Sequence, residues 1–437
     1  MGQTLFKVMK IKKTVFVLLF VLPFVGCKSL DSSFADQSFK NLDSLAVAMD
    51  FFTLRERYSA TKDEFPEKES LYLDAILKNA FNKPELSNKA IQEFLEFPIT
   101  ETSDSLRKRL LGTKLTNYIH LYQYAEALQV NEELQRNYAQ FLDSTRLEDL
   151  RNTQKIWMAL ENIPPQQIFI PTDVSLPITK DKAGLATLAT EIGGTTTQFV
   201  FDTGANFSVI QRSVADSLGM ILIPAQFVVD AATGLKVKSD LAVAEELQLG
   251  EITLKHVVFL VFDDADLSFP SINYEIKGIL GFPVIRAMQE IHITEDSLYI
   301  PQQPTDYHLY NLAYDEFMPI VKVMYGPDPL RFNFDTGAQT TSLYSKFYRK
   351  YQPEIDANYT KTTLNTGGAG GHASFQGYRL NNISLSIGGA EATLDNLQLF
   401  PDKIGVTDAL YGNLGQDFIK QFHTMILSFK SASVLFK

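Results

Sequence analysis

Phe199-Val200-Phe201-Asp202-Thr203-Gly204-Ala205 is the stretch that decides the fold of this 437-residue chain, because it occurs twice. The second copy is Phe332-Asn333-Phe334-Asp335-Thr336-Gly337-Ala338, displaced by 133 residues (from 202 to 335). In each copy an apolar run leads into Asp-Thr-Gly, and alanine follows. At ordinary amino acid usage one Asp-Thr-Gly arises by chance in roughly one chain in ten of this length. Two matched copies therefore indicate a duplicated unit.

The sequence downstream of each copy repeats as well. Ala232-Thr233-Gly234 corresponds to Asn365-Thr366-Gly367, and Gly278-Ile279-Leu280-Gly281 corresponds to Gly412-Asn413-Leu414-Gly415. A helix-like stretch and a final strand follow each glycine motif. We therefore predict an internal duplication of roughly 135 residues per unit, whose element order suits a pseudo-twofold pair of lobes.

The β character of this part of the chain comes from its period of two after Pro165. Alternation and β-branched residues predict paired strands that deliver each Asp at a strand end. The expected strands are 175–178, 185–192 and 195–201 in the first unit, and 319–324 and 330–334 in the second.

These motifs resemble the active-site loops of aspartic peptidases, and the alanine after each Asp-Thr-Gly gives them a retropepsin-like form. In that family an apolar-apolar-glycine segment lies beside each loop. Ile279-Leu280-Gly281 fits this pattern fully, and Asn413-Leu414-Gly415 fits it with a polar first residue, which makes the pattern a weaker indicator of packing in that lobe. The resemblance covers residues 168–437 and implies a mainly β fold with two retropepsin-like β-barrel lobes in pseudo-twofold arrangement.

The resemblance also implies roles for the motif residues. Asp202 and Asp335 are the expected catalytic pair, and Thr203 and Thr336 are expected to cross-link the two loops beneath it. The remaining loop residues support the geometry, since glycine permits a tight turn and close approach of the loops. These supporting residues are Gly204, Ala205, Gly337 and Ala338.

Hydrolysis by two carboxylates requires that they lie about 3 Å apart around one water and share one proton. The ionised carboxylate acts as general base on the water while the protonated one donates to the substrate carbonyl. Ala205 and Ala338 stand where pepsin-like enzymes carry Ser or Thr, so they remove a hydroxyl donor that favours the charged carboxylate. We therefore expect activity at mildly acidic to near-neutral pH. Neither a metal nor an organic cofactor is expected.

Two segments are predicted to be flaps over the cleft, 228–240 and 363–377. Their tips contain Ala232, Thr233 and Gly234 in the first unit, and Thr366, Gly367 and Gly368 in the second. The glycine-rich second tip lacks the Gly-Lys-Ser/Thr ending of a phosphate-binding loop. A hairpin that closes on an extended peptide is the favoured interpretation.

The first 27 residues have the pattern of an export signal. Four lysines precede an apolar run from Val15 to Val25, which is too short to span a membrane as a helix. The run ends at Cys27, the only cysteine, and Phe24-Val25-Gly26-Cys27 resembles a bacterial lipobox. We predict an exported lipoprotein held in the cell envelope, at the outer membrane, by a lipid on Cys27; whether it faces the periplasm or the outside is open. An ordinary cleaved signal peptide is the alternative.

Residues 28–163 have helical periodicity, as shown by Leu73, Ile76, Leu77, Ala80 and Phe81 on one helix face. Further helices are expected at 86–97, 111–123 and 124–142. Segment 122–128 resembles a tetratricopeptide turn, so this domain is either a repeat that docks a protein partner or a plain helical bundle. The predicted organisation is signal peptide 1–27, helical domain 28–163, first lobe 164–304 and second lobe 305–437.

The net charge and the motifs that the sequence lacks argue against other classes of function. The formal net charge of −11 argues against a nucleic-acid-binding protein, which needs a dominant basic face. The six histidines do not stand at metal-ligand spacing, and no Gly-x-Ser-x-Gly motif is present. We predict an exported aspartic endopeptidase with a polypeptide substrate. The alternatives are a catalytically inactive peptide-binding lipoprotein and an obligate dimer whose lobes pair between chains.

Overall fold

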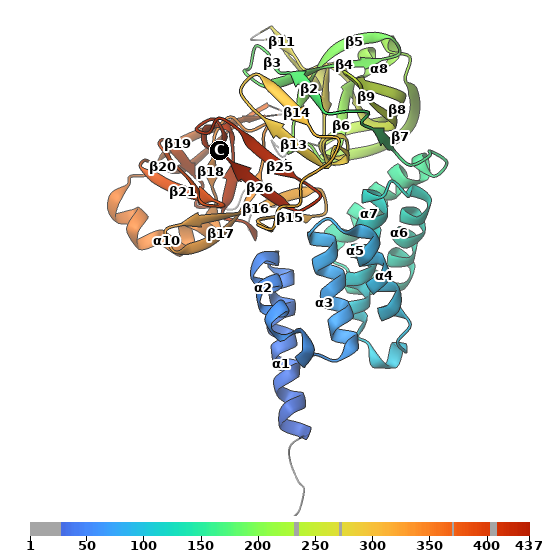
Figure 1. Cartoon of the computed structure of the whole chain (residues 1–437), viewed down its shortest axis with the longest axis vertical. Helices are drawn as coiled ribbons and strands as arrows, with labels where there is room; N and C mark the ends of the chain where they lie inside the picture. The colour runs from blue at the N-terminus through green and yellow to red at the C-terminus, as the bar shows by residue number, and fades with distance from the viewer. Residues whose placement is uncertain (1–27, 231–235, 271–272, 369–370, 403–408) are drawn as a thin grey trace, which may run out of the picture.

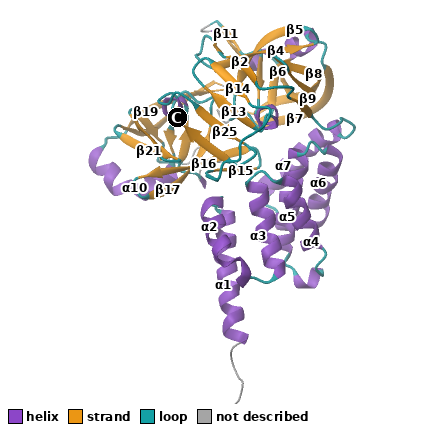
Figure 2. Ribbon diagram, in the orientation of Figure 1, coloured by secondary structure: helices purple, strands orange, loops and turns teal. Residues whose placement is uncertain are grey.

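The computed structural model describes residues 28–230, 236–270, 273–368, 371–402 and 409–437. An N-terminal helical region is followed by β structure that continues to the C-terminus (Figure 1). Figure 2 shows that the helices of this region gather on one side of the strands. The predicted β content and the predicted N-terminal helical region are thus both present.

The helical region is a series of antiparallel helices joined by short turns. Asp50, Ser103 and Asp143 each cap a helix by accepting a hydrogen bond from a backbone N–H of the first turn. Positive φ at Asn82 and Tyr122 ends α3 and α5 at equivalent turns. The helices are α1 (Lys28–Val47), α2 (Phe51–Thr61), α3 (Glu67–Ala80), α4 (Pro84–Leu95), α5 (Asp104–His120), α6 (Tyr124–Tyr138) and α7 (Ser144–Leu160), with 3-10 turns η1 (Lys62–Glu64), η2 (Ile99–Glu101) and η3 (Ala139–Phe141).

Two helix boundaries differ from the predicted ones for a local reason. The helix α5 begins at Asp104, seven residues before the expected start, because its first turn is polar and is fixed by the Ser103 cap rather than by apolar spacing. The expected helix 124–142 ends at Tyr138 and tightens into η3.

The first large sheet has nine strands, and pairing of β8 with β9 closes part of it into a ring. The strand β12 lies parallel to β5 and antiparallel to β6, so it is threaded between them. The strands are β1 (Gln167–Phe169), β3 (Thr179–Lys180), β4 (Ala186–Ile192), β5 (Thr195–Phe201), β6 (Ser208–Gln211), β7 (Ile221–Asp230), β8 (Lys236–Leu249), β9 (Ile252–Phe262) and β12 (Gly278–Leu280). The connecting elements are α8 (Arg212–Ser217), η4 (Asp264–Leu267) and the paired strands β10 (Ser268–Phe269) and β11 (Tyr274–Glu275).

The second large sheet has ten strands and repeats this pairing. Here β24 lies parallel to β17 and antiparallel to β18. The strands are β15 (Leu312–Asp315), β16 (Met318–Tyr325), β17 (Asp328–Phe334), β18 (Ser342–Leu343), β19 (Thr362–Gly368), β20 (Gly371–Leu380), β21 (Ile383–Ile387), β22 (Ala390–Leu394), β23 (Leu397–Leu399) and β24 (Gly412–Leu414). The helix α10 (Ser345–Asn358), which the periodicity analysis did not predict, follows β18.

A third sheet of five strands joins the ends of both halves. Its central pair is β13 with β25, in which Ile291 lies opposite Leu427. The strands in order are β2 (Val174–Pro177), β14 (Ser297–Ile300), β13 (Glu290–Ile293), β25 (Met425–Ser428) and β26 (Ser433–Phe436); α9 (Phe282–Ala287) and α11 (Gln416–Ile419) precede the β13 and β25 strands. The two halves of the β region are therefore hydrogen-bonded to each other.

The helical region shares its cores with the β sheets. Helices α1 to α5 form one apolar cluster with Ala313, Ile320 and Leu410 of the second half. Helices α5 to α7 form another cluster with residues of β6 to β9, including Val209, Leu241, Val258 and Leu260. None of the described helices is both long and apolar enough to cross a membrane.

Candidate active site

Asp202 and Asp335 each begin a loop at the end of a strand, β5 and β17 respectively. The same two anchors hold each loop. The backbone N–H of Asp202 donates to the carbonyl of Leu280 at 3.1 Å, and that of Asp335 donates to the carbonyl of Leu414 at 3.1 Å. At the other side of the loops, the carbonyl of Ala205 accepts from the N–H of Phe282 at 2.8 Å. The carbonyl of Ala338 accepts from the N–H of Gln416 at 2.9 Å.

Thr203 and Thr336 join the two loops directly. The backbone N–H of each threonine donates to the Oγ1 of the other at 3.0 Å, and the two hydroxyl oxygens lie 3.2 Å apart. The Thr203 hydroxyl is also 3.3 Å from the carbonyl of Phe334. Both threonines are buried, so these bonds replace solvent for four polar groups. The structure therefore places the two loops in reciprocal contact.

Gly204 and Gly337 lie where no side chain fits. A Cβ atom on Gly204 would lie 2.7 Å from Oδ1 of Asp335 and 3.2 Å from Oδ1 of Asp202. A Cβ atom on Gly337 would lie 2.6 Å from Oδ1 of Asp202. The two carboxyl groups thus both come within about 3.2 Å of one point, and each glycine makes room for the carboxyl group of the opposite half.

Burial and mutual repulsion alter the acidity of this pair. Loss of solvent, and then the neighbouring charge of Asp335, raise the pKa of Asp202 to about 7. Burial also raises the pKa of Asp335. Backbone N–H groups work against both shifts: Gly204 donates to Asp202 Oδ1 at 2.8 Å and Gly337 donates to Asp335 Oδ1 at 2.9 Å. The pair therefore keeps a proton near neutral pH.

Asn413 contacts the candidate site, although the sequence predicted no site role for it. Its Nδ2 donates to Oδ2 of Asp335 at 3.1 Å, which works to lower the pKa of that carboxyl group. The amide is oriented by Asn333, whose Nδ2 donates to Oδ1 of Asn413 at 2.7 Å. The polar first residue of Asn413-Leu414-Gly415 therefore contacts the site, and its departure from the apolar pattern was the signal that could have identified it.

The described strands of both predicted flap segments pair in antiparallel fashion. In the first, β7 pairs with β8, and Val228 lies opposite Lys238; Ala232, Thr233 and Gly234 lie outside the described residues. In the second, β19 pairs with β20. The backbones of Thr366, Gly367 and Gly368 lie opposite Ala373, His372 and Gly371.

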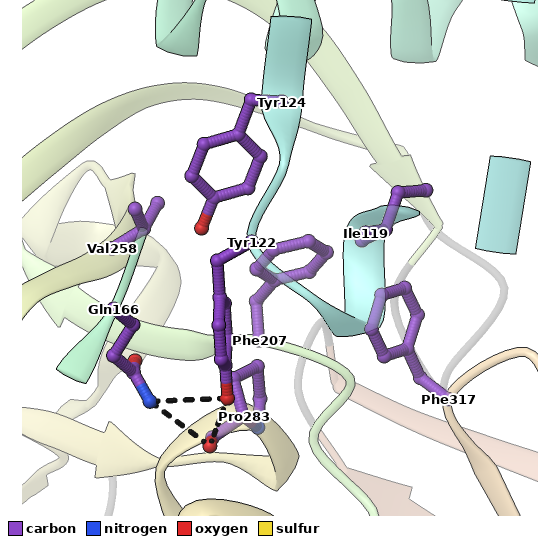
Figure 3. Close-up of a pocket in the computed structure, with 8 residues that line it drawn as sticks. All are labelled: Ile119, Tyr122, Tyr124, Gln166, Phe207, Val258, Pro283 and Phe317. Atoms are coloured by element: carbon purple, nitrogen blue, oxygen red, sulfur yellow. Dashed lines mark hydrogen bonds between the residues drawn. The ribbon is translucent and has the colours of Figure 1, made fainter. Parts of the chain in front are cut away.

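The helical region contacts the segment that follows the Asp202 loop. Phe207, two residues after Ala205, lies 6.5 Å from the ring of Trp157 in α7 and 5.2 Å from that of Phe317 (ring centroids). Figure 3 shows the small cavity beside Phe207, about 10 Å³, which is room for about one water. Tyr122 and Pro283 both line this cavity, and the hydroxyl of Tyr122 donates to the carbonyl of Pro283 at 2.9 Å.

Two other sequence predictions concern the lipid anchor and the absence of a metal. Cys27 lies outside the described residues. Across the described residues no group of three or more His, Cys, Asp or Glu side chains is arranged to hold a metal ion.

One comparison with known proteins agrees with the motifs over part of the chain. Residues 188–284 match the aspartyl protease family, which confirms the resemblance to aspartic peptidases for the half that carries Asp202. A crystal structure of a retropepsin-like aspartic protease from Rickettsia conorii is 18% identical over 29% of this chain and 98% of that one, with a TM-score of 0.23. No curated protein matches the chain.

Proposed function

We propose that the chain is an aspartic endopeptidase in which Asp202 and Asp335 form one catalytic dyad. The observation that carries this proposal is the approach of both carboxyl groups to one point, between loops cross-linked by Thr203 and Thr336. A capping role for each Asp at its own turn would not require the opposite loop to be glycine. The family match over residues 188–284 supports the same assignment for the first half.

The proposed reaction uses water as the nucleophile. One water is held between the two carboxyl groups, of which one is ionised and one is protonated. The ionised group takes a proton from the water as it attacks the peptide carbonyl, and the protonated group donates to the carbonyl oxygen. The shared proton belongs to the pair, so neither Asp is assigned the charged state alone.

The proposed pH range follows from the raised pKa of Asp202. Hydrolysis needs the singly protonated pair, and burial with mutual repulsion keeps that form up to about pH 7. Ala205 and Ala338 supply no side-chain hydroxyl that would stabilise the doubly ionised pair. The activity is therefore expected at mildly acidic to near-neutral pH and declines above it.

The proposal also covers the two lobes, the substrate, the location of the chain and the helical region. The two β halves are duplicated retropepsin-like lobes in pseudo-twofold relation, as the repeated threading of β12 and β24 supports. An extended polypeptide is the substrate, bound by strand-like pairing with the flaps. The chain is exported, and a lipid on Cys27 anchors it in the cell envelope. The contact between the helical region and both β halves favours a built-in part of the enzyme over a separate repeat domain.

A cleavage assay tests the proposal. The chain lacking residues 1–27 is incubated with a denatured protein across pH 4–8, beside Asp202→Asn and Asp335→Asn. We expect cleavage by the unsubstituted chain and loss of it in both variants. Equal cleavage by all three proteins, or none by any, would favour the alternative of a non-catalytic peptide-binding protein. Full activity of a monomeric species would exclude pairing of lobes between chains.

A further inference from the structure

The strand β7 carries one side of the first flap, and its outer edge faces the helical region. In the first large sheet β7 ends the strand path, with β8 on its inner side. Figure 1 shows α7 next to β7. An edge strand presents unpaired backbone N–H and C=O groups, which another strand or a peptide can use. What covers this edge therefore bears on substrate binding.

Asn152 of α7 covers the edge at Val228. Its Nδ2 donates to the carbonyl of Val228 at 2.7 Å, and its Oδ1 accepts from the N–H of Val228 at 2.9 Å. A side-chain amide carries one acceptor and one donor group, the same pair that a neighbouring strand would present. The Nζ of Lys155, one turn further along α7, donates to the carbonyl of Gln226 at 3.0 Å.

Two residues of β7 just before Val228 are held from the β8 side of the strand. Asp240 in β8 accepts from the N–H groups of Ala225 and Gln226 at 2.9 and 3.0 Å. This occurs where the register of β7 shifts and Gln226 has positive φ. Arg212 forms an ion pair with Asp240 at 2.7 Å. The segment 225–228 is thus fixed at two successive places, one within the sheet and one by α7.

We propose that Asn152 is a positioning residue for the peptidase reaction: through Val228 it holds β7, a described strand of the first flap, in the position in which that strand contacts a bound peptide. This inference rests on the proposed function, because a flap position matters only if a peptide is bound and cleaved beneath it. It makes α7 a support of the first flap, and it removes Val228 from the positions at which a peptide can pair with the flap edge.

The test compares Asn152→Ala with Gln154→Ala. Gln154 lies on the same helix, and its side chain contacts Gln135 and Glu132 within the helical region, so its removal controls for the loss of an amide from α7. Hydrogen exchange is measured by mass spectrometry on peptides that span 224–230. Asn152→Ala should exchange there at least about threefold faster than the unsubstituted chain, since one backbone N–H loses its acceptor, and Gln154→Ala should not.

Kinetics test the positioning role. For Asn152→Ala we expect a KM raised about fivefold or more with kcat little changed, because flap contacts act mainly on binding. Asn152→Asp adds a readout that a purely structural role would not move. A protonated carboxyl group offers one donor and one acceptor as the amide does, so the defect should be smaller at pH 4.5 than at pH 7.5, relative to the unsubstituted chain at each pH.

The exchange and kinetic results for Asn152→Ala each support or reject the proposed role of Asn152. Unchanged exchange in Asn152→Ala would show that the contact does not hold the strand, and the inference would be wrong. Faster exchange with unchanged KM would reject the positioning role. If the unsubstituted chain cleaves no substrate, the positioning role falls with the proposed function, while the exchange experiment still reports whether α7 holds the flap.

Discussion

Asp335→Asn should flatten the pH dependence of stability, and the sign follows from the raised pKa of Asp202. The folded protein keeps the proton of Asp202 up to about pH 7, whereas the unfolded chain releases it near 3.8. The folded state therefore binds more protons between these values, and the free energy of unfolding falls as pH rises through this window. The stabilisation is fully present below about pH 4 and is lost as pH passes about 7.

The magnitude comes from the size of the shift. A change from 3.8 to about 7 spans about three pH units, which at 1.36 kcal/mol per unit is about 4 kcal/mol. Burial is the largest cause and the charge of Asp335 is the second. Removal of that charge should therefore recover less than half, or about 1–2 kcal/mol of the loss between pH 4 and pH 8. Loss of the titration of Asp335 itself acts in the same direction.

Urea unfolding at pH 4, 5, 6, 7 and 8 measures this effect. Asp315→Asn is the matched control, because burial, followed by the charge of Glu316, raises the pKa of Asp315 to about 7 as well. Asp315→Asn should reduce the pH dependence of the free energy of unfolding by its own contribution. The further reduction caused by Asp335→Asn should be the same with or without the Asp315→Asn substitution. A constant stability difference between the Asp335→Asn variant and the unsubstituted chain from pH 4 to pH 8 would refute the reasoning.

Three further predictions concern neighbouring contacts. Thr203→Val removes the hydroxyl that joins the loops and should lower the free energy of unfolding by about 1–3 kcal/mol in urea, whereas Thr203→Ser should lose much less; equal losses would argue against a hydroxyl contact. Asn413→Leu removes a donor that lowers the pKa of Asp335, so the alkaline limb of the pH–rate profile should move upward; a downward move would contradict this electrostatic role. Tyr122→Phe deletes the hydroxyl bonded to Pro283 and should cost about 1 kcal/mol of stability, while no change would mean that this contact between helices and β region is not stabilising.

The duplicated motifs carried most of the local β prediction. The strand β5 has the predicted bounds, Thr195–Phe201, because the turn Gly193-Gly194 precedes it and the Asp-Thr-Gly loop follows it. The helix α10 was missed, since its sequence is polar and contains Pro353. Its apolar residues Phe347, Tyr351 and Ile355 do recur at intervals of four and contact the core, so the internal proline is what argued against a helix.

Contacts between distant segments could not be predicted from one sequence. Asn413 reaches Asp335 only because β24 is threaded beside β17, and the polar residue alone did not indicate this contact. Asn152 showed no signal at all. It is an ordinary polar residue of a helix, and its role depends on the docking of α7 against β7, which apolar periodicity does not specify.

The most direct test of a shared dyad is a double-mutant cycle on kcat/KM, measured at pH 5–6 with one peptide substrate. Asp202→Asn and Asp335→Asn should each lower kcat/KM by roughly 10³-fold or more, and the double variant should be little worse than either, because residues that act as one unit are not additive. Substantial cleavage by either single variant, or losses that multiply in the double variant, would contradict the account.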